Sequence, residues 1–218
     1  MLRFGPATGP VIVVALPLFE EANRTRAFAV TILRALAERG IAGALPDLPG
    51  QGESLLPTHE TGLAKLRTAF AAAVSHLEAP AFTLAIRSGA LIDADATVTG
   101  RYHLSPMAGA DLRRELVRAR QASSREAGEA FDPASLDTAS EPVELAGNLI
   151  APAFLADLAA ATPSSEGVRT VRLQTEAKPA DARLPGSPLW RRAEPDNDLA
   201  FAQAVADDIA QWVELCAA

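Results

Sequence analysis

The fold of this chain is decided by residues 80–94, which read P-A-F-T-L-A-I-R-S-G-A-L-I-D-A. Ala81–Ile86 is a short apolar run that begins just after a proline, and such a run predicts a buried β-strand. Ala90, Leu91 and Ile92 follow a glycine, which is typical of the start of a helix. The stretch therefore predicts a strand that turns sharply into a helix, with Arg87 at the turn.

Small residues lie on either side of Arg87. Ala85 and Gly89 form a small-x-x-x-small pattern, which lets a strand and a helix pack closely around one strained residue. This is the shape of a nucleophile elbow, but the guanidinium of Arg87 stays protonated and cannot attack a substrate. The pattern therefore predicts the scaffold of a serine hydrolase without the atom that performs its chemistry. We expect a strained backbone at Arg87, of the kind with φ above zero.

The composition predicts one domain, residues 1–218, because 49% of the residues are hydrophobic and can fill a sizeable core. The net charge of −7 argues against a nucleic-acid partner, which would need a basic face. The longest apolar run near the N-terminus, Val11–Phe19, is too short to cross a bilayer and has no signal-peptide layout. We therefore expect no membrane insertion and a cytoplasmic location. The single cysteine, Cys216, excludes an internal disulfide and is expected in the core of the last helix.

Strand-like and helix-like segments alternate along the chain. Buried strands are expected over residues 11–16, 41–45, 81–86, 101–104 and 168–174, with an edge-strand stub at 1–4 and a strand or its remnant at 189–190. Helices are expected over 23–40, 63–77, 108–130, 153–161 and 199–216, the first with Asn23 as its N-cap. Crossover helices of this length predict a mostly parallel α/β sheet of six or seven strands flanked by helices, with residues 81–86 central.

Residues 107–161 interrupt this alternation, and we interpret them as a small cap insertion. The segment is expected to contain the arginine-rich helix, a loop at 131–140, a short strand at 142–146, a turn at 147–152 and a second helix. Such a cap would lie over the carboxyl ends of the strands, where open α/β sheets place their ligands. In its first helix, arginines alternate with Asp111, Glu115 and Glu126, which predicts a solvated, self-paired face; an acidic polymer is the alternative partner.

Two loops carry a resemblance to known families. Residues 47–54 read D-L-P-G-Q-G-E-S, which is similar to the D-x-x-G-x-G-x-S turn of α/β-hydrolases. Residues 17–26 read P-L-F-E-E-A-N-R-T-R and resemble the P-x-F-E-E-x-N-x-[ST]-R loop of the exosortase A system-associated hydrolases, type 2, which also carry an arginine in the elbow. Residues 144–152 and 188–194 also resemble segments of the same hydrolases. The resemblance implies the α/β-hydrolase fold and, by association, a role in polysaccharide export or protein sorting.

The remaining members of a serine-hydrolase triad are hard to place on this sequence. The fold orders them nucleophile, acid, histidine. The chain has three histidines: His59, His76 and His103. None follows the last expected strand, where Trp190 and its neighbours stand instead, although Glu176 or Asp181 would serve as the acid. Losing triad members typically costs about 10⁴ to 10⁶ in turnover, so ordinary serine hydrolysis is not expected.

Ser88 is the one candidate for a displaced catalytic nucleophile. Its backbone N–H, paired with an N–H near Leu18, would then form an oxyanion hole, and the protein would be a hydrolase or acyltransferase of the esterase or thioesterase type. The other interpretation is a small polar residue in the first helical turn whose hydroxyl bonds to nearby backbone. We favour the second interpretation, because no base is placed to activate the hydroxyl.

Arg87 needs a negative partner. A cation at a helix N-terminus opposes the helix dipole by roughly 0.3–1 kcal/mol, and a partly buried one must also lose its hydration. One interpretation is a fixed ion pair with Glu20, Glu21 or Asp47, and we expect at least one of the two glutamates to make it. The other is that Arg87 binds an anionic ligand group such as a carboxylate or a phosphate. Both interpretations hold if one glutamate is paired with Arg87 and the other faces the ligand cleft at the ends of the strands.

The sequence therefore predicts a binding site at the elbow. Its candidate residues are Arg87, Ser88, Leu18, Glu20, Glu21 and Asn23. No cluster of acidic residues and histidines has metal-ligand spacing, and no cofactor is expected. The favoured hypothesis is a non-catalytic binding or accessory protein, whose partner is an anionic small molecule or another protein.

Overall fold

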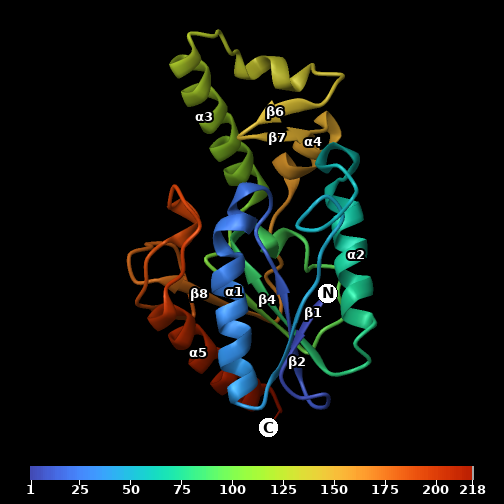
Figure 1. The fold of residues 1–218 in the computed structure, drawn as a ribbon, viewed down its shortest axis with the longest axis vertical. Helices are drawn as coiled ribbons and strands as arrows, with labels where there is room; N and C mark the ends of the chain where they lie inside the picture. The colour runs from blue at the N-terminus through green and yellow to red at the C-terminus, as the bar shows by residue number, and fades with distance from the viewer. Residues whose placement is uncertain (218) are drawn as a thin grey trace.

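Seven strands form one sheet in the computed structural model, which describes residues 1–217 (Figure 1). Their spatial order is β1 (Leu2–Phe4), β3 (Ala42–Leu45), β2 (Val11–Ala15), β4 (Ala81–Ile86), β5 (Gly100–Leu104), β8 (Val168–Leu173) and β9 (Ala182–Leu184). Of the seven, β1 alone runs antiparallel to its neighbour. The predicted parallel-type sheet, with residues 81–86 at its centre, is confirmed.

Both faces of the sheet are buried, and this explains the continuous apolar runs of its central strands. Successive side chains of β2 enter two different cores, so Val11 and Val13 belong to one and Ile12 and Val14 to the other. The helices α1 (Glu20–Glu38) and α5 (Leu199–Ala217) cover the second face, and α2 (Leu63–Ser75) covers the first (Figure 1). No helix among the described residues is both long and apolar enough to cross a membrane.

The chain between β5 and β8 lies beyond the carboxyl ends of the parallel strands, at the top of Figure 1. This cap segment, residues 107–161, contains the 3₁₀ helix η3 (Pro133–Asp137) and four further elements: α3 (Gly109–Ala127), the hairpin strands β6 (Val143–Leu145) and β7 (Asn148–Ile150), and α4 (Pro152–Ala160). Leu116, Phe154 and Leu158 are buried in the same core as α2. The cap segment therefore shares its core with the sheet and is held in place over the strand ends.

Several local predictions were wrong at the ends of elements. Helix α1 begins at Glu20, so Asn23 lies inside the helix and is not its N-cap. The carboxylates of Glu20 and Glu21 are stabilising in the first turn, because this is the positive end of the helix dipole. The elbow continues as a five-residue 3₁₀ helix, η2 (Arg87–Leu91), and not as an α-helix. Two residues after η2, Asp93 turns into the core, where it bonds with Thr83 and His103.

Short elements and the C-terminus account for the other differences. Residues 189–190 belong to the 3₁₀ helix η4 (Leu189–Arg191), and the last strand is β9, which lies between residues 174 and 189, where we expected no strand. The predicted turn 147–152 contains β7. Segments of three residues are too short to show a strand period. Cys216 is exposed and not in the core, because the last turn of α5 extends past the elements that bury Ile209 and Val213.

The turn after β4 is strained as predicted, with Arg87 at φ 54°. Gly89 explains why the chain must bend here. A Cβ atom built on Gly89 would lie 2.1 Å from the carbonyl oxygen of Ala15, on the neighbouring strand β2. The backbone of η2 therefore packs directly on the backbone of β2, and the positive φ at Arg87 is the conformation that brings it there.

Replacing Gly89 with alanine should destabilise the protein by about 3 kcal/mol, the upper end of the usual range for overpacking, because the atom in the way belongs to the backbone. For a chain of this length the unfolding midpoint should fall by about 6–12 °C, as measured by thermal denaturation. Gly62→Ala is the matched control, since open space surrounds Gly62 and the only expected loss is a capping preference of below about 1 kcal/mol. Equal midpoints for the two variants would contradict this account of the elbow.

Candidate functional site: a charged cleft at the elbow

Arg87 is held by an ion pair with the first turn of α1. Its Nη2 atom lies 3.1 Å from Oε1 of Glu21, and its Nε atom lies 3.4 Å from Oε2 of the same residue. The two side chains are only 9% and 13% exposed. The expected pairing of Arg87 with one of the two glutamates is therefore confirmed. Glu20 lies 4.0 Å from Arg24 instead, and Asp47 pairs with Arg26 at 3.1 Å.

Two residues that are distant in sequence complete the surroundings of Arg87. Glu115 of α3 reaches down from the cap segment and places Oε2 3.3 Å from Nη2 of Arg87. The guanidinium also lies 5.2 Å from the ring centre of Trp190, in cation–π contact. The prediction of a self-paired solvated helical face is wrong for Glu115, because the start of α3 lies directly above the elbow. It holds for Asp111, which pairs with Arg114 one turn along the same helix.

Burial raises the pKa of Glu21 above its ordinary value of 4.5, with the nearby Glu115 adding to the rise and Arg87 opposing it. A carboxyl group whose pKa is raised in the folded state binds protons more readily there than in the unfolded chain. Its contribution to stability is therefore fully present below pH 4.5 and is lost as the pH rises through the raised value. The ion pair with Arg87 limits this loss.

Ser88 is fully buried, and its hydroxyl is already in use. Its Oγ atom accepts a hydrogen bond from the backbone N–H of Leu18 at 2.9 Å. The same N–H would be needed as a donor in an oxyanion hole. Histidine is also missing beside Ser88, since the Nε2 atom of buried His103 lies 3.0 Å from Asp93 Oδ2, and no hydrogen bond in residues 1–217 joins a histidine to Ser88.

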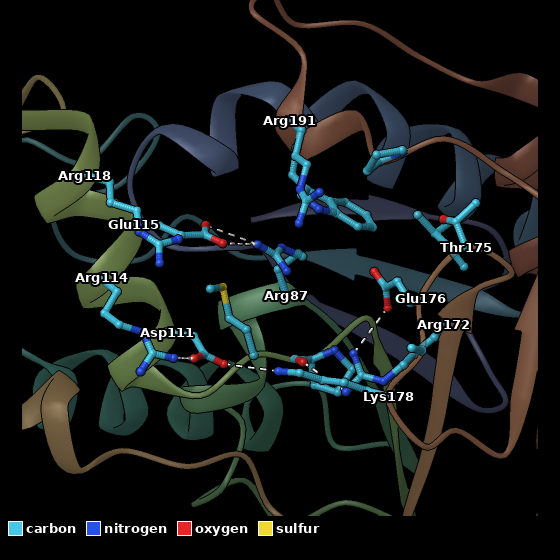
Figure 2. A pocket seen from close by; sticks show the side chains of 16 residues that line it. Arg87, Asp111, Arg114, Glu115, Arg118, Arg172, Thr175, Glu176, Lys178 and Arg191 are labelled. Carbon is cyan, nitrogen blue, oxygen red and sulfur yellow. Dashed lines mark hydrogen bonds and ion pairs between the residues drawn. The ribbon is translucent and has the colours of Figure 1, made fainter. Parts of the chain in front are cut away.

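A cleft of about 600 Å³ opens beside Arg87, between the cap segment and the loops that follow β5 and β8 (Figure 2). Six of its lining residues are basic: Arg87, Arg114, Arg118, Arg172, Lys178 and Arg191. Three are acidic: Asp111, Glu115 and Glu176. The lining therefore carries three more positive than negative charges, although the whole chain has a net charge of −7.

Two of the basic residues have no acidic partner. Arg172 pairs with Glu176 at 3.2 Å, and Lys178 pairs with Asp111 at 3.2 Å. Arg118 and Arg191, in contrast, form no ion pair with any acidic side chain in residues 1–217. Figure 2 shows Arg118 extending from α3 and Arg191 from η4 toward the middle of the cleft. These two guanidinium groups are the best-placed donors for an anion.

The predicted site residues line two neighbouring cavities, although Arg87 contacts Glu21 and Ser88 contacts Leu18. Of the predicted set, Arg87 lines the charged cleft, whereas Leu18, Glu20 and Glu21 line a second cavity beside it. Ser88 lies buried against Leu18, which it contacts as described above. Asn23 is exposed on α1 and lines neither of these two cavities. Within residues 1–217, no three histidine, cysteine, aspartate or glutamate side chains are grouped so that they could hold a metal ion.

Sequence reasoning missed most of the cleft. The basic residues that it missed are Arg114, Arg118, Arg172, Lys178 and Arg191. Arg172 and Lys178 flank Glu176 just after the late strand, and Arg191 follows Trp190 at the place where a histidine was sought. The loops at the carboxyl ends of the strands were thus the available clue, since parallel strands bring these loops to one edge.

The comparisons with solved structures identify the fold. The esterase Est1E from Butyrivibrio proteoclasticus, solved with ferulic acid, matches with a TM-score of 0.60 at 14% identity, over 98% of this chain and 94% of that one. Alpha/beta hydrolase domain-containing protein 10 from mouse gives 0.57 at 15%, over 98% and 92%. A thermophilic esterase from Thermogutta terrifontis gives 0.55 at 14%, over 99% and 92%. The chain therefore has the α/β-hydrolase fold. No protein-family model matches the sequence, and neither does any curated protein.

Replacing Arg87 with alanine should destabilise the protein by about 3 kcal/mol at pH 8, because the nearly buried Glu21 carboxylate loses its cation. Without Arg87 the Glu21 pKa rises further, so protonation relieves this penalty as the pH falls. The difference between wild type and variant in urea unfolding should therefore shrink between pH 8 and pH 5.

The control is the same arginine substitution made in a Glu21→Gln background, where the cost should not depend on pH. An equal cost of Arg87→Ala at pH 5 and pH 8 in the wild-type background would show that Glu21 is not the group that Arg87 neutralises.

Proposed function

We propose that this protein binds a small anionic molecule in the charged cleft and performs no serine-hydrolase chemistry. The observation that carries the proposal is the elbow itself, where an arginine at φ 54° occupies the nucleophile position and contacts Glu21, Glu115 and Trp190. A carboxylate or a phosphate is the chemical group that the surrounding arginines suit best.

The contacts of Ser88 support the non-catalytic part of the proposal. A serine hydrolase needs an exposed hydroxyl, a histidine to activate it and two free N–H donors for the oxyanion. Ser88 is buried, its hydroxyl accepts a bond from Leu18, and His103 is bound to Asp93. The alternative, a hydrolase or acyltransferase that uses Ser88, would require all three of these arrangements to change.

The charges of the cleft support the binding part. Arg118 and Arg191 lie in a concave site without acidic partners, and Arg87 is bonded to Glu115 only at 3.3–3.4 Å. The Glu115 side chain is 43% exposed, so this third contact is loose and exchangeable. An incoming anion can take the place of Glu115 beside Arg87. The possible association with exosortase systems rests on the sequence resemblance alone, and we retain it as a hypothesis about cellular context.

The wild-type protein should not react with a fluorophosphonate probe, because Ser88 has no base to activate its hydroxyl. An active serine esterase labelled in parallel is the positive control. The Arg87→Ser variant, made with Glu21→Gln to avoid an unpaired buried charge, should likewise hydrolyse no p-nitrophenyl ester above the background rate. Labelling of the wild type that disappears in Ser88→Ala would overturn the non-catalytic assignment.

Acetate and inorganic phosphate should bind in the cleft, as measured by isothermal titration calorimetry, whereas neutral acetamide should not. Arg118→Gln and Arg191→Gln should each weaken anion binding about tenfold or more, because each removes a charge-assisted hydrogen bond. Glu115→Gln should strengthen binding about fivefold by removing the competing carboxylate. Arg125→Gln is the matched control, since Arg125 is an exposed arginine of the same helix outside the cleft. If neither anion binds, or if the two cleft variants behave like the control, the proposal fails.

A further inference from the structure

A second cavity of about 500 Å³ adjoins the charged cleft on the other side of Glu115. Three residues line both spaces: Glu115, Trp190 and Arg191. Half of its lining is apolar and mostly aliphatic, from Leu18, Phe19, Leu112, Leu116, Ala119 and Ala146. The volume lies within the range of ordinary small-molecule sites. The charged cleft therefore continues into a space that suits an apolar group.

The charged residues of the second cavity do not make it a second anion site. Glu21 is paired with Arg87, and Arg24 lies 4.0 Å from Glu20 and donates to the carbonyl oxygen of Trp190 at 3.3 Å. Glu20, Glu21 and Glu115 would repel an anion, Arg24 is already engaged by Glu20, and Arg191 is shared with the first cavity. Charge thus favours an anionic group in the first cavity and an uncharged group in the second.

The boundary between the two cavities is a movable side chain. Glu115 is 43% exposed and contacts Arg87 at 3.3–3.4 Å, so little free energy holds it across the boundary. Trp190, in contrast, is almost fully buried and forms a fixed wall shared by both spaces. If Glu115 turns toward solvent, the two cavities become one continuous space along Arg191 and Trp190.

We infer that the two cavities form one binding site for an amphipathic anion, a molecule with a single anionic head and an aliphatic tail. The inference rests on the proposed function, because the head occupies the anion site between Arg118 and Arg191. The tail passes Trp190 and packs against Leu112 and Leu116 of α3. Neither cavity alone accounts for such a ligand, but together they match its charged and apolar ends.

A chain-length series tests the inference on the full-length protein. Butyrate, hexanoate and octanoate should bind with rising affinity in isothermal titration calorimetry, by up to about fourfold for each added CH₂ group that is buried. Octanoate should therefore bind about 10²-fold more tightly than butyrate. Octanol, which has the tail without the head, should bind more weakly than octanoate.

Ala119→Trp locates the tail, because Ala119 is exposed on α3 and lines only the second of the two cavities. The added indole should fill that space, so that octanoate binds no better than butyrate. Ala122→Trp is the matched control on an exposed position of the same helix outside both cavities, and it should keep the wild-type series. Thermal unfolding of both variants establishes that they are folded.

The possible outcomes distinguish failure of the inference from failure of the proposed function. Binding of butyrate with no dependence on chain length would overturn the inference and leave the proposed anion site standing. A chain-length dependence that persists in Ala119→Trp would place the tail elsewhere and would also overturn it. Failure of every carboxylate and of inorganic phosphate to bind would refute the proposed function itself.

Discussion

The ion pair between Arg87 and Glu21 is the contact on which the arrangement of the site depends. It joins the end of the central strand β4 to the first turn of α1, and both side chains are almost withdrawn from water. Such a pair is weak evidence for stability, because desolvation offsets much of the attraction. Its geometric effect is larger. Glu115 from the cap segment and Trp190 from η4 meet the same guanidinium, so segments far apart in the sequence are fixed around one cation.

The strain at the elbow has a source in the packing of the backbone. Gly89 packs against the carbonyl oxygen of Ala15, and this close approach requires the sharp turn whichever side chain stands at position 87. The positive φ angle therefore persists when the residue is arginine. The elbow conformation is thus a property of the fold, and the likeness to the solved structures at 14% identity likewise concerns the fold alone.

Local sequence patterns were sufficient to predict the central sheet and the elbow. The buried run of β4, its proline boundary and the glycine two residues after Arg87 are all visible within a few consecutive residues of the sequence, although the contacts that they make are long-range. The composition of the cleft could not be predicted in the same way. Arg118 and Arg125 lie in the same arginine-rich helix, and only its packing above the elbow decides which of them enters the cleft. Glu115 was assigned to a solvated face for the same reason, since its partner lies 28 residues away.

The short turn at the elbow offers little backbone dipole to an anion, so the proposed anion site relies on side chains. The 3₁₀ helix η2 ends after five residues, and Asp93 beyond it turns into the core to meet Thr83 and His103. A 3₁₀ helix of this length has few aligned peptide dipoles, so its N-terminus attracts an anion only slightly and opposes a cation only slightly. The expected dipole penalty for Arg87 is correspondingly small. The positive charge of the cleft therefore comes from guanidinium groups carried by α3, β8 and η4 and not from oriented backbone amides.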